Sequence, residues 1–120
     1  MKKLLSLMIA MLLVLAAVPA FAQDTSHECP HGGTTISDLR SCVEHAVMMG
    51  HIDNRGIANS LFAKLASAQA AQDRGQLRVA VNVLNALAHE VEAQAGKHID
   101  AHHADHMLNH IQDVIRTLGG

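Results

Sequence analysis

A helical period interrupted by single glycines constrains this chain more than any other feature. From Thr35 onward apolar residues recur every three or four positions, the spacing of one face of an α-helix. The pattern breaks at Gly50, Gly75 and Gly96, where a helix typically ends in a left-handed conformation. No stretch alternates polar with β-branched residues, so we expect no sheet. The sequence therefore predicts an all-α domain.

Four helical segments are expected, over residues 35–49, 54–74, 76–95 and 100–118. Short links place sequential helices antiparallel, so we predict a small four-helix up-down bundle with a short first helix. The expected apolar stripes comprise Ile36, Leu39, Val43, Ala46 and Val47, then Ile57, Leu61, Leu65 and Ala68, then Leu77, Val81, Leu84, Ala88, Val91 and Ala95, and finally Ala104, Met107, Leu108, Ile111, Val114, Ile115 and Leu118.

The starts of three helices have recognisable capping residues. Thr35 and Asp38 have the spacing of a capping box, in which each side chain accepts a hydrogen bond from the other residue's backbone. Asn54 and Asp100 precede the second and fourth stripes and are expected N-caps.

The N-terminus has the pattern of an export signal. Lys2 and Lys3 precede an uncharged apolar run, and Ala20-Phe21-Ala22 is a small-residue cleavage pattern. A run of about 15 residues is too short to span a bilayer comfortably, so we expect no transmembrane segment in the mature chain. We therefore predict a signal peptide over 1–22, a flexible, loop-like His/Cys leader over 23–34 and a helical bundle over 35–120, in a periplasmic or secreted protein.

The composition excludes some partners. Loss of the signal would remove two lysines and leave a mildly acidic chain, which does not favour nucleic acid. There is no Trp and no Tyr, and Phe62 is the sole aromatic residue after the signal, so platforms for stacking bases or sugars are missing.

The ten histidines are unevenly placed, and several fall in the fourth predicted helix. His102, His106 and His110 follow an i, i+4, i+8 spacing, which we call the histidine ridge. The helical period puts this ridge away from the apolar stripe, toward solvent, with His103 nearer the core. Two imidazoles four positions apart can share a Zn²⁺, Cu²⁺ or Ni²⁺ ion. The alternative is a solvated polar face that happens to use histidine.

Cys29 and Cys42 are the two cysteines of the chain. Export favours a disulfide between them. The alternative is a thiolate–imidazole metal site formed with His27, His31 and His45, a weaker candidate because it needs reduced thiols.

The residues suggest no catalytic machinery and no cofactor-binding motif. His89-Glu90 lacks the second histidine, four positions after His89, of a zinc-protease helix. A Cys42–His45 pair has no evident oxyanion donors. Met48-Met49 is expected to pack in the core and at the helix cap rather than to bind copper. We therefore predict no enzymatic activity.

Several blocks of the chain resemble a known family. They are Ile36-Ser37-Asp38-Leu39, the run from Gly50 to Leu61, Ala63-Lys64-Leu65 with Ala68, Asn85-Ala86-Leu87, and the run from Val91 to Ile99. In these blocks the sequence resembles a FIMAH domain, a helical module usually attached to exported bacterial enzymes. The resemblance implies a non-catalytic accessory or binding module and carries over no functional residues. With no enzyme domain in the sequence, we expect no accessory role in cis.

Two functions follow as hypotheses. The first is an exported, non-catalytic helical interaction module of the bacterial envelope or extracellular space, with a protein or glycan partner. The alternative is a histidine-rich periplasmic protein that binds Zn²⁺, Cu²⁺ or Ni²⁺.

Overall fold

The computed structural model describes residues 33–120, so the predicted signal and most of the predicted leader lie outside the described residues. Four helices follow one another: α1 (Ile36–Met48), α2 (Arg55–Asp73), α3 (Leu77–Gln94) and α4 (Ala101–Thr117). The first is the shortest, as predicted. No strand forms within the described residues, where the β-type pairing is limited to isolated bridges.

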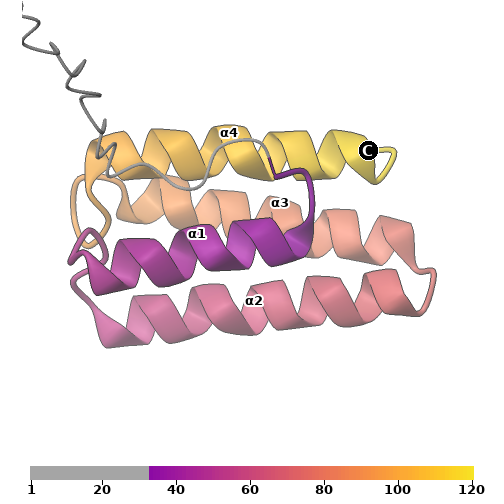
Figure 1. Cartoon of the computed structure of the whole chain (residues 1–120), viewed down its shortest axis with the longest axis horizontal. Helices are drawn as coiled ribbons and strands as arrows, with labels where there is room; N and C mark the ends of the chain where they lie inside the picture. The colour runs from indigo at the N-terminus through magenta and orange to yellow at the C-terminus, as the bar shows by residue number, and fades with distance from the viewer. Residues whose placement is uncertain (1–32) are drawn as a thin grey trace, which may run out of the picture.

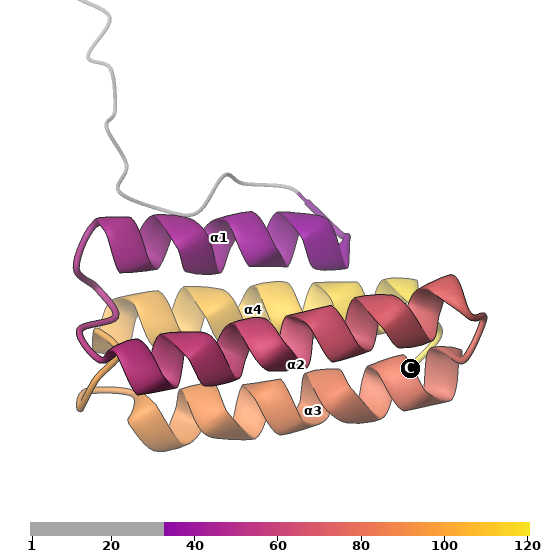
Figure 2. The same cartoon turned by 90° about the horizontal axis from the view of Figure 1, so that it is seen from below.

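The helices form an antiparallel up-down bundle, which confirms the predicted fold (Figure 1). Each helix packs against two neighbours, and α4 closes the ring by returning beside α1 (Figure 2). The most extensive packing joins α2 and α3. Ala68, Ala71 and Ala80 are fully buried on these helices, and such small side chains allow two backbones to approach closely.

The three predicted helix caps are all present. Asp38 N donates to Thr35 Oγ1 and Thr35 N donates to Asp38 Oδ2, both at 3.1 Å, which completes the capping box. Asn54 Oδ1 accepts from Ile57 N at 3.0 Å. These local bonds satisfy backbone donors that the first turn of a helix leaves open.

The α1–α2 and α3–α4 links lie at the same end of the bundle and are paired with each other (Figure 1). Ile52 and Ile99, both buried, form an antiparallel bridge. Asp53 N donates to the His98 carbonyl oxygen at 3.1 Å, next to that bridge. We call this the bridged end, and the opposite end, which carries the α2–α3 link, the open end.

Glycines permit the turns into both bridged links. Gly50 and Gly96 have φ of +77° and +72°, in the left-handed region that a side chain disfavours. The predicted helix ends at these glycines are confirmed.

The core agrees with most of the predicted stripes but corrects α3. Leu77 was expected inside and is 43% exposed, whereas Ala80 and Leu87, which the pattern missed, are buried. The inward face of α3 must contact both α2 and α4, so it is centred on Leu84 and Leu87 rather than on a narrow four–three seam.

Met48 and Met49 also differ from expectation. They are 80% and 43% exposed, because α1 ends here and its buried stripe stops at Ala46. The predicted core packing of this pair is wrong, whereas its predicted place at the helix cap is confirmed, because Met49 is the C-cap of α1.

Searched over residues 33–120, the helices include none with the length and hydropathy needed to cross a bilayer.

Candidate functional site

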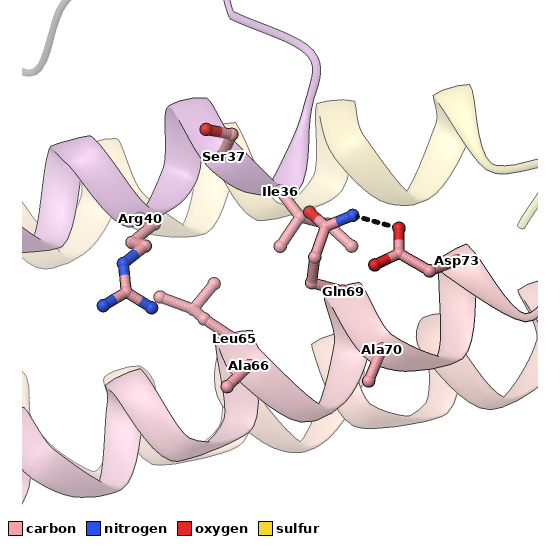
Figure 3. A pocket seen from close by; sticks show the side chains of 8 residues that line it. All are labelled: Ile36, Ser37, Arg40, Leu65, Ala66, Gln69, Ala70 and Asp73. Carbon is pink, nitrogen blue, oxygen red and sulfur yellow. Dashed lines mark hydrogen bonds between the residues drawn. The ribbon is translucent and has the colours of Figure 1, made fainter.

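A groove runs between α1 and α2, with a volume of about 580 Å³. Figure 3 shows aliphatic side chains at its floor and polar ones around them. Its lining residues are Ile36, Ser37, Arg40, Leu65, Ala66, Gln69, Ala70 and Asp73. An apolar floor with a few polar groups is the usual composition of a binding site.

Three polar side chains of the groove are held in place by hydrogen bonds to their neighbours. Gln69 Nε2 donates to Asp73 Oδ1 at 2.8 Å. Arg40 Nε donates to Glu44 Oε1 at 3.0 Å, and its guanidinium lies 5.4 Å from the centre of the Phe62 ring. A guanidinium has five N–H donors, so Arg40 retains donors for a ligand. The groove could not be predicted from the sequence, because its two walls come from different helices.

Only two of the three side chains of the histidine ridge on α4 lie next to each other. His102 and His106 lie with their Nε2 atoms 3.3 Å apart and their ring centres 4.6 Å apart. His110 does not join them in a three-ligand group within the described residues. Eight residues of helix separate His102 from His110 by about 12 Å, which one ion does not span. The ridge therefore offers a pair of ligands.

The ridge is also less exposed than the helical period predicted. His102 is exposed, but His106 and His110 are half-buried, because α1 packs beside this part of α4. His110 Nε2 and, on α1, His45 Nδ1 are buried and have no hydrogen-bond partner within the described part of the chain.

The proposed leader ligands fall where the structure gives no description. His27, His31 and Cys29 lie outside the described residues. Cys42 is fully buried on the inward face of α1. The Cys29–Cys42 disulfide and the alternative thiolate–imidazole site both stay predictions.

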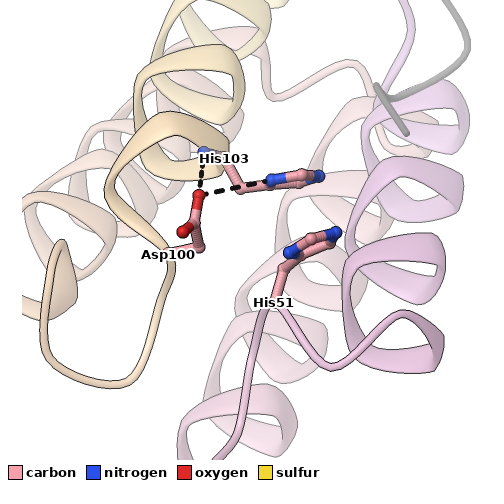
Figure 4. A group of neighbouring side chains, drawn as sticks. All are labelled: His51, Asp100 and His103. Atoms are coloured by element: carbon pink, nitrogen blue, oxygen red, sulfur yellow. Dashed lines mark hydrogen bonds and ion pairs between the residues drawn. The ribbon is translucent and has the colours of Figure 1, made fainter. Parts of the chain in front are cut away.

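A cluster that sequence analysis did not identify occupies the bridged end: His51, Asp100 and His103, which we call the link cluster (Figure 4). The rings of His51 and His103 stack with their centres 3.6 Å apart and their planes inclined by 16°. Asp100 Oδ1 accepts from His103 N at 3.1 Å, as the cap of α4, and lies 3.5 Å from His103 Nδ1. The cluster thus joins the α1–α2 link to the first turn of α4.

The electrostatics of the cluster favour an ionised carboxylate. The hydrogen bond from the His103 backbone N–H lowers the pKa of Asp100 below its ordinary value, in spite of desolvation. The partial positive charge at the start of α4 acts in the same direction. Beside the cluster, His98 Nδ1 lies 2.8 Å from Asp53 Oδ1, so a second His–Asp pair connects the same two links.

The fold and these sites describe a small antiparallel helical bundle with a groove between two helices and a histidine–carboxylate cluster between two links. Comparison with family models gives a match to the FIMAH domain over residues 36–116. The chain belongs to the FIMAH family of helical accessory domains, which confirms the resemblance seen in its sequence. Comparison with curated proteins and with solved structures gave no match.

Proposed function

We propose that this protein is an exported, non-catalytic interaction module that binds a protein partner in the groove between α1 and α2. Membership of a family of accessory domains associated with exported proteins supports this role. The apolar floor and polar rim of the groove are the observation that carries it.

The chemistry of the groove favours a protein partner over a glycan. Its floor is aliphatic, with Ile36, Leu65 and Ala70, and among the described residues no aromatic side chain on which a sugar ring could stack lines it. Arg40 at the rim suits a carboxylate of the partner, because a guanidinium binds carboxylates with directional hydrogen bonds. A segment with aliphatic side chains and one acidic residue therefore fits best.

Export is part of the proposal and has its own test. The pattern of residues 1–22 supports cleavage after Ala22. The intact mass of protein recovered from the cell envelope or medium should correspond to a chain beginning at Gln23. A mass that includes the first 22 residues would contradict export by a cleaved signal.

The groove is tested by a charge placed within it. Ala66→Glu introduces a carboxylate on the exposed face of α2 beside the groove, and it should abolish capture of the partner from envelope extracts. Ala93→Glu is the matched control, since Ala93 is also an exposed helical alanine but lies on α3, outside the groove. Equal capture by the two variants would rule out the groove.

A second role, metal binding at the ridge, is favoured by the approach of His102 Nε2 to His106 Nε2 at 3.3 Å. Two imidazoles at this spacing suit Zn²⁺, Cu²⁺ or Ni²⁺. The double variant His102→Gln/His106→Gln should then bind fewer ions per chain than the single variant His89→Gln, which removes an exposed histidine on α3. Unchanged binding by the double variant would show that the pair is a solvated face.

A further inference from the structure

Three metal-ligating side chains meet at the bridged end, although His51 lies far in the sequence from Asp100 and His103. Backbone hydrogen bonds between the two links hold these residues close together. Asp100 N donates to the His51 carbonyl oxygen at 2.8 Å, and the bridge between Ile52 and Ile99 follows directly. Because these bonds already hold the ligand positions, an ion that binds here orders few additional groups.

The donors of the link cluster have the chemistry and spacing of a metal site. One donor atom from each of the three side chains lies within 4.8 Å of the others. Imidazole nitrogens and carboxylate oxygens bind Zn²⁺ at about 2.1 Å, so donors of a tetrahedral ion lie about 3.4 Å apart. For the stacked imidazoles of His51 and His103 to bind one ion, each ring has to rotate about the soft torsion between Cβ and the ring.

One ligand of the cluster is buried, and the other two can be reached by an ion from solvent. His103 is buried, with 4% of the residue exposed, while Asp100 is exposed and His51 half-buried. His51 and Asp100 also line a cavity of about 380 Å³ between the two links, which Asp53 and His98 border. The carboxylates of Asp53 and Asp100 would attract a cation to this cavity, and water within it could complete the coordination.

We propose that His51, Asp100 and His103 form a binding site for a divalent transition-metal ion, with Zn²⁺ as the best-matched ion, and that the ion clamps the α1–α2 link to the start of α4. Two imidazoles and one carboxylate are an established ligand set for Zn²⁺, with one position left for water. The site rests neither on the groove between α1 and α2 nor on the His102–His106 pair.

The test uses natively exported protein without an affinity tag, stripped of metal by a chelator. Zn²⁺ titration by calorimetry measures affinity, and Co²⁺ absorption reports the coordination geometry. His51→Gln should weaken Zn²⁺ binding by at least about tenfold, since loss of an outer-shell partner alone costs 10–100-fold. Asp100→Asn should also weaken it, and its amide oxygen still accepts the capping hydrogen bond, so α4 stays formed.

The matched control is His89→Gln, which removes an exposed imidazole on α3 and should bind Zn²⁺ as the parent does. All variants are compared in a background that carries His102→Gln/His106→Gln, so that an ion held by the ridge does not contribute. The Zn²⁺-dependent rise in melting temperature should persist in His89→Gln and disappear in His51→Gln. No Zn²⁺ uptake by the background protein, unchanged affinity when His51→Gln is added, or lost affinity when His89→Gln is added would each overturn the proposal. Ala66→Glu should leave Zn²⁺ binding unchanged, so a failure of the groove does not bear on this site.

Discussion

The bridged and open ends of the bundle are held together by different kinds of interaction. At the open end the α2–α3 link forms local bonds, such as Gln76 N to the Ala71 carbonyl oxygen at 2.9 Å. At the bridged end, Asp53 N donates to the carbonyl oxygen of His98, from the other link. Long-range backbone bonds thus position side chains from two links, and the link cluster lies where they do so. This difference suggests that the bridged end contributes both stability and chemistry.

The largest difference between the ends should appear when one apolar side chain at each end is truncated. Ile99→Ala removes a side chain that is 1% exposed at the bridged end and should lower the free energy of unfolding by about 2–5 kcal/mol. Leu77→Ala, at a position that is 43% exposed near the open end, should change it by less than about 1 kcal/mol. Urea unfolding of both variants measures this contrast, and equal losses of unfolding free energy would contradict it.

The predicted Cys29–Cys42 disulfide should stabilise the chain independently of either end. A loop of this size is worth roughly 3 kcal/mol, because the bond restricts the unfolded state. Alkylation followed by intact mass should detect no free thiol before reduction. Reduction should lower stability while preserving the contrast between Ile99→Ala and Leu77→Ala. Two alkylated thiols in the unreduced, exported protein would contradict the bond.

Two link glycines allow the ends to be compared at the same backbone conformation. Gly96, at the bridged end, and Gly75, at the open end, both have φ of +72° with open space around the missing Cβ. Substitution of either by Ala should cost about 1–2 kcal/mol, from backbone strain alone. If the link cluster binds Zn²⁺, only Gly96→Ala should also weaken that binding, because Gly96 N donates to the Ile99 carbonyl oxygen at 2.8 Å beside the cluster. Weaker Zn²⁺ binding in both variants would remove the distinction.

The smallest effect concerns two capping carboxylates, Asp38 near the open end and Asp100 at the bridged end. Hydrogen bonds from the Thr35 side chain and backbone lower the pKa of Asp38, and the His103 backbone lowers that of Asp100. The unfolded chain therefore binds these protons more tightly, and stability is lost as pH falls below about 4. Measured with chelator present, Asp38→Asn and Asp100→Asn should each flatten this loss. If stability falls with pH in both variants as it does in the parent, these carboxylates do not cause the loss.

Much of the local structure could be predicted from the sequence. The caps at Thr35, Asn54 and Asp100 and the turn at Gly50 depend on side chains within a few positions of the backbone they satisfy. The helical period also predicted the bundle, because each apolar stripe has to be buried against another. It failed at Leu77, where the period assigns a face but the neighbouring helices decide how much of it is covered.

Of the two histidine sites, one could be predicted from the sequence and the other could not. The approach of His102 to His106 follows from the rise of one helix and was predictable from their spacing of four. The stacking of His51 on His103 was not, because it depends on how α1 and α4 are placed and on the bridge between their links. The sequence by itself determined the helices, their caps and which histidines share a helix. Tertiary structure alone decided which residues from separate links meet, since that requires long-range contacts that no local pattern encodes.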